Sequence, residues 1–305
     1  MITIDPPSST SIPAAANSRP PRLLNHACRF SAVALFVLLA SACGNAQSTR
    51  APLAKWQLVW SDEFNAANGS SPDPNKWTFD LGGSGYGNNE LESYTNRPVN
   101  VQQQDGSLVI TARKEKYTGT DGLARQYTSA RIRTQGLFSQ AYGRFEASIQ
   151  LPLGKGIWPA FWLLGNNIDS VGWPMTGEID IFENIGEPFT SYSTLHGPGY
   201  SGAKGISAKY PLPAGQAVNT AFHLYAIEWA PNDIKFFFDK QLVAERTPAD
   251  LPAGTAWVYD HPFFIILNVA VGGAWPGNPD ATTTFPQQMR VDFVRVYTRL
   301  PSISQ

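Results

Sequence analysis

Short runs in which apolar and polar residues alternate recur along most of this 305-residue chain. Clear examples lie at 107–112, 143–149, 222–229, 233–238 and 291–297. Side chains of a strand point alternately to opposite faces of a sheet, so these runs are typical of half-buried strands. Turn residues separate them, and helical periodicity is nearly absent. The pattern therefore predicts an all-β protein, a sandwich of two antiparallel sheets or a jelly roll.

The composition agrees with an extracellular all-β protein. Charged residues make up only 15%, while the chain has 26 Gly, 24 Pro and nine Trp. Glycine and proline favour turns, and aromatic residues favour strands. The formal net charge is −1, and it becomes −3 without residues 1–42, which hold three Arg and one Asp. We therefore expect no nucleic-acid partner.

The first 42 residues have the pattern of an export signal. Arg19, Arg22 and Arg29 precede an apolar run at 31–39, and the small residues at 40–42 follow it. So short a run cannot cross a membrane as a permanent helix, so we expect no membrane span in the mature chain. We further expect a short linker at 43–51, a single domain at 52–300 and a monomer.

Cys43 directly follows Ala-Ser-Ala, as in a lipoprotein signal, although Ala40 stands where Leu is usual. Cleavage after Ala42 or Ala46 without a lipid is the equal alternative. The expected location is therefore secreted or periplasmic, with or without a lipid anchor on Cys43. Since the only other cysteine, Cys28, lies in the signal, the mature domain should lack disulfides.

Three acids lie in one apolar strand, Glu178-Ile179-Asp180-Ile181-Phe182-Glu183. Glu178 and Asp180 share a face, while Glu183 would point the other way on a regular strand. A one-residue β-bulge near Ile181 and Phe182 would return it to that face. Clustered carboxylates repel one another, so stability alone does not explain them. The alternative interpretation is an acid-rich strand face that is simply exposed to solvent.

Glycoside hydrolysis explains such a cluster, because it needs one ionised carboxylate and one protonated carboxyl across the scissile bond. An Asp between them can hydrogen-bond the nucleophile and tune both pKa values. A separation of about 5–5.5 Å between the two groups would mean retention through a covalent intermediate.

The segment Glu178–Glu183 resembles the signature of glycoside hydrolase family 16, in the bulged form typical of laminarinase-like endo-β-1,3-glucanases. The resemblance covers essentially the whole mature chain in the right order. Further matching segments are 60–64, 87–95, 129–134, 142–147, 156–165, 267–277 and 291–297. In the second of these, Glu92 and Ser93 stand where Gln and Tyr are commoner.

The resemblance implies a jelly roll with a concave substrate cleft and a retaining mechanism. On the matching positions, Glu178 is the nucleophile, Glu183 the acid/base and Asp180 the assisting residue. The implied activity is cleavage of internal β-1,3 bonds, or mixed β-1,3-1,4 bonds, of glucans such as laminarin. No cofactor is expected for catalysis.

A glucan cleft needs flat aromatics for the apolar sugar faces and polar donors for the hydroxyls. Trp158, Trp173 and Trp275 each precede a proline, which suits a loop rim, and are our candidates. The tryptophans expected in the core are Trp60, Trp162, Trp229 and Trp257.

Polar candidates for substrate binding are Arg133 and His196, with Asn88 and Glu92 as weaker candidates carried mainly by the resemblance. Arg131 is expected to be a surface charge, and a structural role for His196 is an even alternative. The resemblance also implies a structural calcium held by Glu63, the Gly106 carbonyl and Asp292, with ordinary surface acids as the alternative.

Two rival functions remain open at this stage. One is a non-catalytic β-glucan-binding protein on the same fold, although such proteins usually lose the catalytic pair. The other is a hydrolase of another polysaccharide, such as agarose or carrageenan. A sulfated substrate would call for a basic cleft, which the charge of the mature chain does not suggest.

Overall fold

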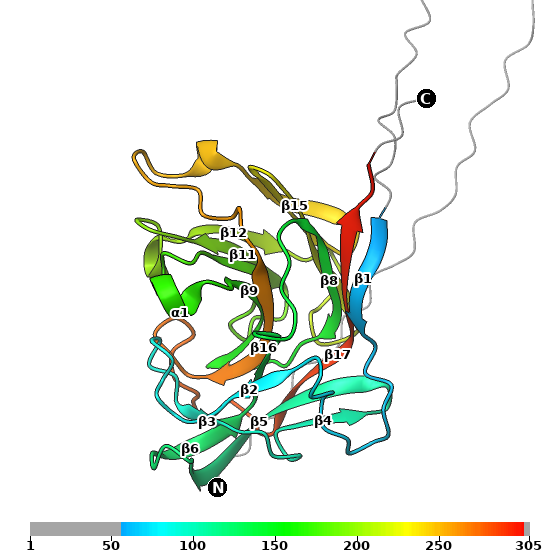
Figure 1. The fold of residues 1–305 in the computed structure, drawn as a ribbon. Helices are drawn as coiled ribbons and strands as arrows, with labels where there is room; N and C mark the ends of the chain where they lie inside the picture. The colour runs from blue at the N-terminus through cyan, green and yellow to red at the C-terminus, as the bar shows by residue number, and fades with distance from the viewer. Residues whose placement is uncertain (1–55, 302–305) are drawn as a thin grey trace, which may run out of the picture. The chain divides into compact units, whose positions relative to one another are not determined.

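The alternating runs form strands that pair into two sheets (Figure 1). The computed structural model describes residues 56–301, so the predicted signal, linker and lipid anchor at Cys43 lie outside the described residues. Helical structure within this range is limited to α1 (Ile168–Val171), η1 (Gly202–Lys204) and η2 (Pro248–Asp250). None of the helices in 56–301 is long and apolar enough to cross a membrane.

The larger sheet has ten strands. They are β1 (Trp56–Asp62), β3 (Glu92–Tyr94), β4 (Val101–Gln104), β5 (Ser107–Thr118), β6 (Ala124–Ser129), β8 (Gly143–Gln150), β13 (His223–Ala230), β14 (Asp233–Phe238), β15 (Gln241–Arg246) and β17 (Gln287–Arg299). Their order is β15-β14-β13-β8-β17-β5-β6-β3, with β1 paired to β17 and β4 to β5.

The second sheet has seven strands and carries the acid-rich segment. They are β2 (Thr78–Asp80), β7 (Arg131–Arg133), β9 (Ile157–Gly165), β10 (Glu178–Glu183), β11 (Thr190–His196), β12 (Ile206–Pro211) and β16 (Phe263–Val271). Their order is β12-β11-β10-β9-β16-β7-β2, all antiparallel. The predicted all-β sandwich is confirmed, although β3 pairs with β6 in parallel.

The core lies between the two sheets and fixes which face of the second sheet is free. Ile179, Leu163 and Ile265 are in register on neighbouring strands and fully buried. Phe182 packs on Tyr225 of β13, with 4.2 Å between ring centroids. Because side chains alternate, the residues between these buried ones point to the opposite face of the second sheet.

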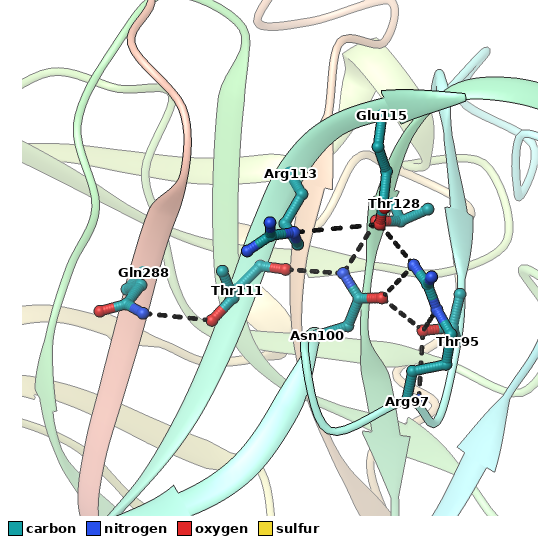
Figure 2. A network of polar contacts seen from close by, with 8 residues as sticks. All are labelled: Thr95, Arg97, Asn100, Thr111, Arg113, Glu115, Thr128 and Gln288. Atoms are coloured by element: carbon teal, nitrogen blue, oxygen red, sulfur yellow. Dashed lines mark hydrogen bonds and ion pairs between the residues drawn. The ribbon is translucent and has the colours of Figure 1, made fainter. Parts of the chain in front are cut away.

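A polar network fastens the segment between β3 and β4 onto β5 and β6 (Figure 2). The fully buried Asn100 donates to the Thr111 carbonyl at 3.0 Å and to Thr128 Oγ1 at 2.9 Å. Its Oδ1 accepts from Thr95 and Arg97, and Arg97 also pairs with Glu115. A buried amide is stable only with its hydrogen bonds made, so this network fixes the strand edge beside β3.

Packing of β10 on the other sheet should dominate its stability. We expect Phe182→Ala to lower the free energy of unfolding by about 3–5 kcal/mol, because it leaves a cavity at a fully buried site. The matched control is Phe189→Ala, at a side chain that is 61% exposed. Urea unfolding measures both, and equal losses would contradict this account of the core.

Candidate active site

The acid-rich strand β10 contains the predicted bulge. Asp180 pairs with Trp162 of β9, but the next β10 residue in register is Phe182, opposite Phe161. The pairing with β11 slips in the same place, between Asp180 and Glu183. One extra residue therefore sits on β10 at Ile181, as the spacing of the acids requires.

The bulge separates acids from apolar residues. Ile179, Ile181 and Phe182 all belong to the buried core. Two serines of β11 bond carbonyls in the bulged half of β10: Ser193 Oγ donates to the Ile181 carbonyl at 2.9 Å and Ser191 Oγ to that of Glu183 at 3.1 Å. These hydroxyls help fix the irregular backbone, a role that the sequence analysis missed.

Glu178 and Asp180 share contacts with His196. The indole N–H of Trp173 donates to Glu178 Oε2 at 2.9 Å. His196 of β11 is in register with Glu178 of β10. Its Nε2 lies 3.3 Å from Asp180 Oδ2 and 3.8 Å from Glu178 Oε1. The structure thus brings Trp173 and His196, both predicted for the site, onto one side of the acids.

Glu183 has an aromatic setting of its own. Trp158 Nε1 donates to Glu183 Oε1 at 3.0 Å. The Trp158 and Trp275 rings pack edge to face, with 5.7 Å between their centroids. The Trp275 and Tyr192 rings do the same, with 4.9 Å between centroids. Trp275 is 42% exposed and Trp173 is 48% exposed, so both rings keep free surface. Tyr192, which the sequence analysis did not name, supports Trp275.

The environment favours uncharged carboxyls. Burial raises the pKa values of Glu178, Asp180 and Glu183, and the charge of Asp180 raises those of Glu178 and Glu183 further. His196 and the Trp173 N–H oppose the shift in the pKa of Glu178. A cluster of this kind shares protons at neutral pH, and the Trp173 N–H beside Glu178 and the Trp158 N–H beside Glu183 each stabilise a carboxylate when one forms.

If Glu178 and Glu183 act on one bond, their positions on β10 fix where that bond lies. Glu178 and Glu183 lie at opposite ends of β10, so a bond that both carboxyls reach must lie over Asp180. An extended substrate would then cross the strands instead of running along β10. The residues level with Asp180 on the neighbouring strands are Thr194, Trp162, Ile266 and Arg133.

Trp162 and Arg131 differ from their predicted places. Trp162 packs with Leu164, Phe264 and Ile266 apart from the main core, because it alternates with the buried Leu163. Trp60, Trp229 and Trp257 do pack in or against the core, as predicted. The Arg131 guanidinium lies 4.7 Å from the centre of the Trp162 ring, so the expected surface charge is wrong.

Asp80 holds both arginines of β7. It pairs with Arg131 at 2.7 Å and with Arg133 at 3.0 Å. The Arg133 side chain is 35% exposed and that of Arg131 only 13%, so Arg133 is the more accessible to a ligand. Both lie on the same face of β7, opposite the buried Ile132.

Asn88 is exposed and shapes the turn that leads to Trp275. Its carbonyl accepts from the Ala274 N–H at 2.7 Å, and its side chain donates to Glu90 Oε1 at 3.2 Å. The structure therefore connects Asn88 to the Trp275 segment, which shares its side of the site with Trp158.

The three residues predicted to hold calcium approach one another along the larger sheet. Glu63 follows β1, Gly106 precedes β5, and Asp292 lies at a register shift in β17, the strand that pairs with both. Both oxygens of Glu63, however, accept from Arg295, at 2.9 and 2.7 Å. An ion held by Glu63 would therefore have to displace Arg295.

Glu178, Asp180 and His196 could also bind a metal ion, because each offers one ligand atom and these three atoms lie within 4.8 Å of one another. Within 56–301 no other group of acidic, His or Cys side chains converges in this way. These three residues belong to the acid cluster of β10 described above, where Glu178 already accepts a hydrogen bond from Trp173.

Three carboxyls on one bulged strand, with tryptophans on both sides, define a glycosidase on a β-sandwich. The family model "Glycosyl hydrolases family 16" matches residues 88–295, and the chain belongs to that family. Glycosidases of this family need no cofactor for catalysis.

The chain is 43% identical over 282 residues to a β-glucanase of Rhodothermus marinus, covering 88% of this chain and 94% of that protein. The crystal structure of the laminarinase catalytic domain from Thermotoga maritima matches with a TM-score of 0.76 and 49% identity, over 81% of this chain and 99% of that one. An endo-β-1,3-glucanase from Pyrococcus furiosus matches with a TM-score of 0.77 and 48% identity, over 81% and 96%.

The raised pKa of Glu183 predicts a pH-dependent cost in stability. A carboxyl whose pKa rises on folding stabilises the fold below its ordinary pKa, and this contribution is lost as pH rises through the folded value. We expect Glu183→Gln to raise the free energy of unfolding at pH 9 by about 1 kcal/mol or more, and by less at pH 5.

Thermal unfolding at both pH values measures this effect. The control is Asp260→Asn, because the Asp260 side chain is 69% exposed. A gain in stability that is the same at pH 5 and pH 9, or that also appears in the control, would contradict a raised pKa of Glu183 in the folded protein.

Proposed function

We propose that this protein is a retaining endo-glycosidase that cleaves internal β-1,3 bonds of glucans such as laminarin. The observation that carries the proposal is the bulged β10, which presents Glu178, Asp180 and Glu183 together beside Trp158 and Trp173. Similarity to proteins named laminarinase and endo-β-1,3-glucanase, over nearly their whole length, supports the substrate class.

Glu178 acts as the nucleophile in this proposal. Its carboxylate attacks the anomeric carbon, while Glu183 gives its proton to the leaving glycosidic oxygen. The Trp173 N–H and His196 next to Glu178 stabilise the charged form before attack. Burial keeps the pKa of Glu183 high, so that it holds a proton to donate.

The second half of the reaction regenerates both groups. Glu183, now ionised, takes a proton from a water molecule, whose oxygen attacks the anomeric carbon and releases Glu178. Asp180 assists by keeping one of the three carboxyls protonated and by holding His196 near Glu178. The product keeps the β configuration, because two inversions occur at the same carbon.

We assign substrate contacts to residues on both sides of β10. Trp173 and His196 lie on the Glu178 side, and Trp158 and Trp275 on the Glu183 side, where rings can stack on sugar faces. Arg133 and Asn88 would bind sugar hydroxyls farther along the cleft.

Hydrolysis must be separated from mere binding and from other substrates. Purified laminarin, mixed-linkage glucan, agarose and carrageenan, assayed for new reducing ends, make this comparison. The proposal expects most product from laminarin. Binding of laminarin without cleavage would indicate a glucan-binding protein, and cleavage of agarose or carrageenan alone would indicate a different substrate.

Azide should distinguish the two glutamates. With an activated aryl β-glucan oligosaccharide, Glu178→Ala plus azide should give the α-glycosyl azide, because azide attacks from the side that the nucleophile leaves. Glu183→Ala plus azide should give the β-product, because azide attacks the covalent intermediate. Without azide, we expect both variants to lose more than about 99% of kcat on laminarin.

Nuclear magnetic resonance of the azide products identifies the anomer. Asp260→Asn serves as the control and should hydrolyse laminarin normally without forming either azide. The β-azide from Glu178→Ala together with the α-azide from Glu183→Ala would reverse the proposed roles, and full laminarin hydrolysis by Glu178→Ala would end the proposal.

We further propose that the chain acts outside the cytoplasm as a monomer, with residues 52–300 as one catalytic domain. The export pattern at 1–42 supports secretion or a periplasmic location, with a lipid on Cys43 as the membrane-attached alternative. Fractionation of cells expressing the wild type and Cys43→Ala tests this, since only loss of membrane association in the variant would support the lipid.

A structural calcium at Glu63, the Gly106 carbonyl and Asp292 is a separate proposal. The approach of β1, β5 and β17 to one another supports it, and oxygen ligands suit calcium. If the ion binds, adding calcium after chelation should raise Tm in the wild type but not in Asp292→Asn. An unchanged Tm in the wild type would contradict the site.

A further inference from the structure

A second pair of buried acids lies outside β10, at the start of β3. Glu92 is fully buried and Glu90 is 6% exposed. Alternation along an extended chain puts Glu90, Glu92 and Tyr94 on one face. Nothing in the reaction proposed above uses this pair, so its cost to stability calls for another explanation.

The two carboxyls have different partners. Glu90 accepts from Tyr94 Oη at 2.9 Å and from Asn88 Nδ2 at 3.2 Å, a setting that suits an anion. Glu92 Oε2 accepts from the Val271 N–H at 2.7 Å, while its buried Oε1 has no hydrogen-bond partner. No ion pair in 56–301 includes Glu92. An uncompensated charge at such a position is costly, so a proton on Glu92 fits better.

The electrostatics agree with this assignment. Burial and the charge of Glu90 hold the pKa of Glu92 well above its ordinary range. Tyr86 and Tyr94 also face the pair, and Arg131 faces these two tyrosines. On the other side, Glu92 pairs through its backbone with Tyr127 of β6.

The pair is bonded to the segment that carries Trp275. The backbone of Glu90 forms an isolated antiparallel β-bridge with Gly272, and the Leu91 N–H donates to the Val271 carbonyl at 2.8 Å. Gly273 lies against the Trp158 ring: a Cβ added to this glycine would lie only 3.2 Å from Trp158 Cζ3. Movement of this segment would therefore displace both Trp275 and its neighbour Trp158.

A hydrogen-bond chain also leads from the pair to the centre of the cleft face. Tyr94 Oη, which donates to Glu90, accepts from Asn268 Nδ2 at 3.1 Å. Asn268 Oδ1 accepts from Trp162 Nε1 at 2.8 Å, and Trp162 is level with Asp180. The pair is thus bonded both to the segment that carries Trp275 and to Trp162, which lies level with Asp180.

We propose that Glu92 is a positioning residue: its protonated carboxyl bonds Glu90 and holds the Val271–Trp275 segment in place for substrate binding. Loss of this proton puts two adjacent charges inside the protein, which the segment relieves by opening. Substrate affinity should therefore fall as pH rises through the pKa of Glu92. The inference rests on the proposed glucanase activity for its kinetic readout only.

The test compares wild type, Glu92→Gln, Glu92→Ala and Glu245→Gln, by KM and kcat on a soluble β-1,3-glucan at pH 6 and pH 9. A glutamine keeps an acceptor for Val271 and a donor for Glu90 but cannot ionise. Glu245 belongs to β15, with a side chain 47% exposed, and serves as the matched control.

We expect KM to rise several-fold from pH 6 to pH 9 in the wild type and in Glu245→Gln, but much less in Glu92→Gln. At pH 6, Glu92→Gln should keep the wild-type KM, while Glu92→Ala should raise it. The kcat ratio of Glu92→Gln to wild type should stay constant with pH, because the β10 acids are unchanged.

Thermal unfolding gives a readout that needs no substrate. The fall in Tm from pH 6 to pH 9 should be smaller in Glu92→Gln than in the wild type. Equal falls in Tm, together with an equal rise in KM, would overturn the proposal. If none of the proteins cleaves glucan, the proposed function fails, but the comparison of Tm still decides whether Glu92 holds a proton.

Discussion

The bulge at Ile181 is the constraint on which the rest of the site depends. Without it, Glu183 would point into the core where Phe182 now packs on Tyr225. With it, three apolar side chains of β10 stay buried while its three acids share the opposite face. Hydroxyls from Ser191 and Ser193 bond carbonyls along this stretch. The sandwich core therefore stabilises a strand that its own carboxyls destabilise.

That conflict is also what makes the site useful for catalysis. Buried, adjacent carboxyls retain protons that isolated surface acids would lose, and a general acid needs such a proton. N–H groups from Trp173 and Trp158 then give Glu178 and Glu183 separate surroundings. The same physics recurs at Glu90 and Glu92, where it holds a loop in position. The three acids of β10 and the pair of Glu90 and Glu92 thus serve two different ends.

Local pattern was enough to predict much of this arrangement. Alternation predicted the sandwich, the spacing of the acids predicted the bulge, and the following proline marked Trp173 for the cleft, where it donates to Glu178. The mistakes involve contacts between distant segments. Arg131 is covered because of Asp80 and Trp162, and Trp162 faces the cleft because of its register with Asp180. Neither register nor partner is visible in a run of residues, and the parallel pairing of β3 with β6 escaped for the same reason.

Trapping of the covalent intermediate tests the central claim most directly. A 2-deoxy-2-fluoro β-1,3-glucan oligosaccharide with a good leaving group should inactivate the enzyme. The fluorine slows both formation and breakdown of the glycosyl-enzyme, while the good leaving group speeds formation alone, so the intermediate accumulates. Peptide mapping by mass spectrometry should then find the sugar on Glu178. A label on Glu183 or Asp180, or turnover to an inverted product with no label, would contradict the account.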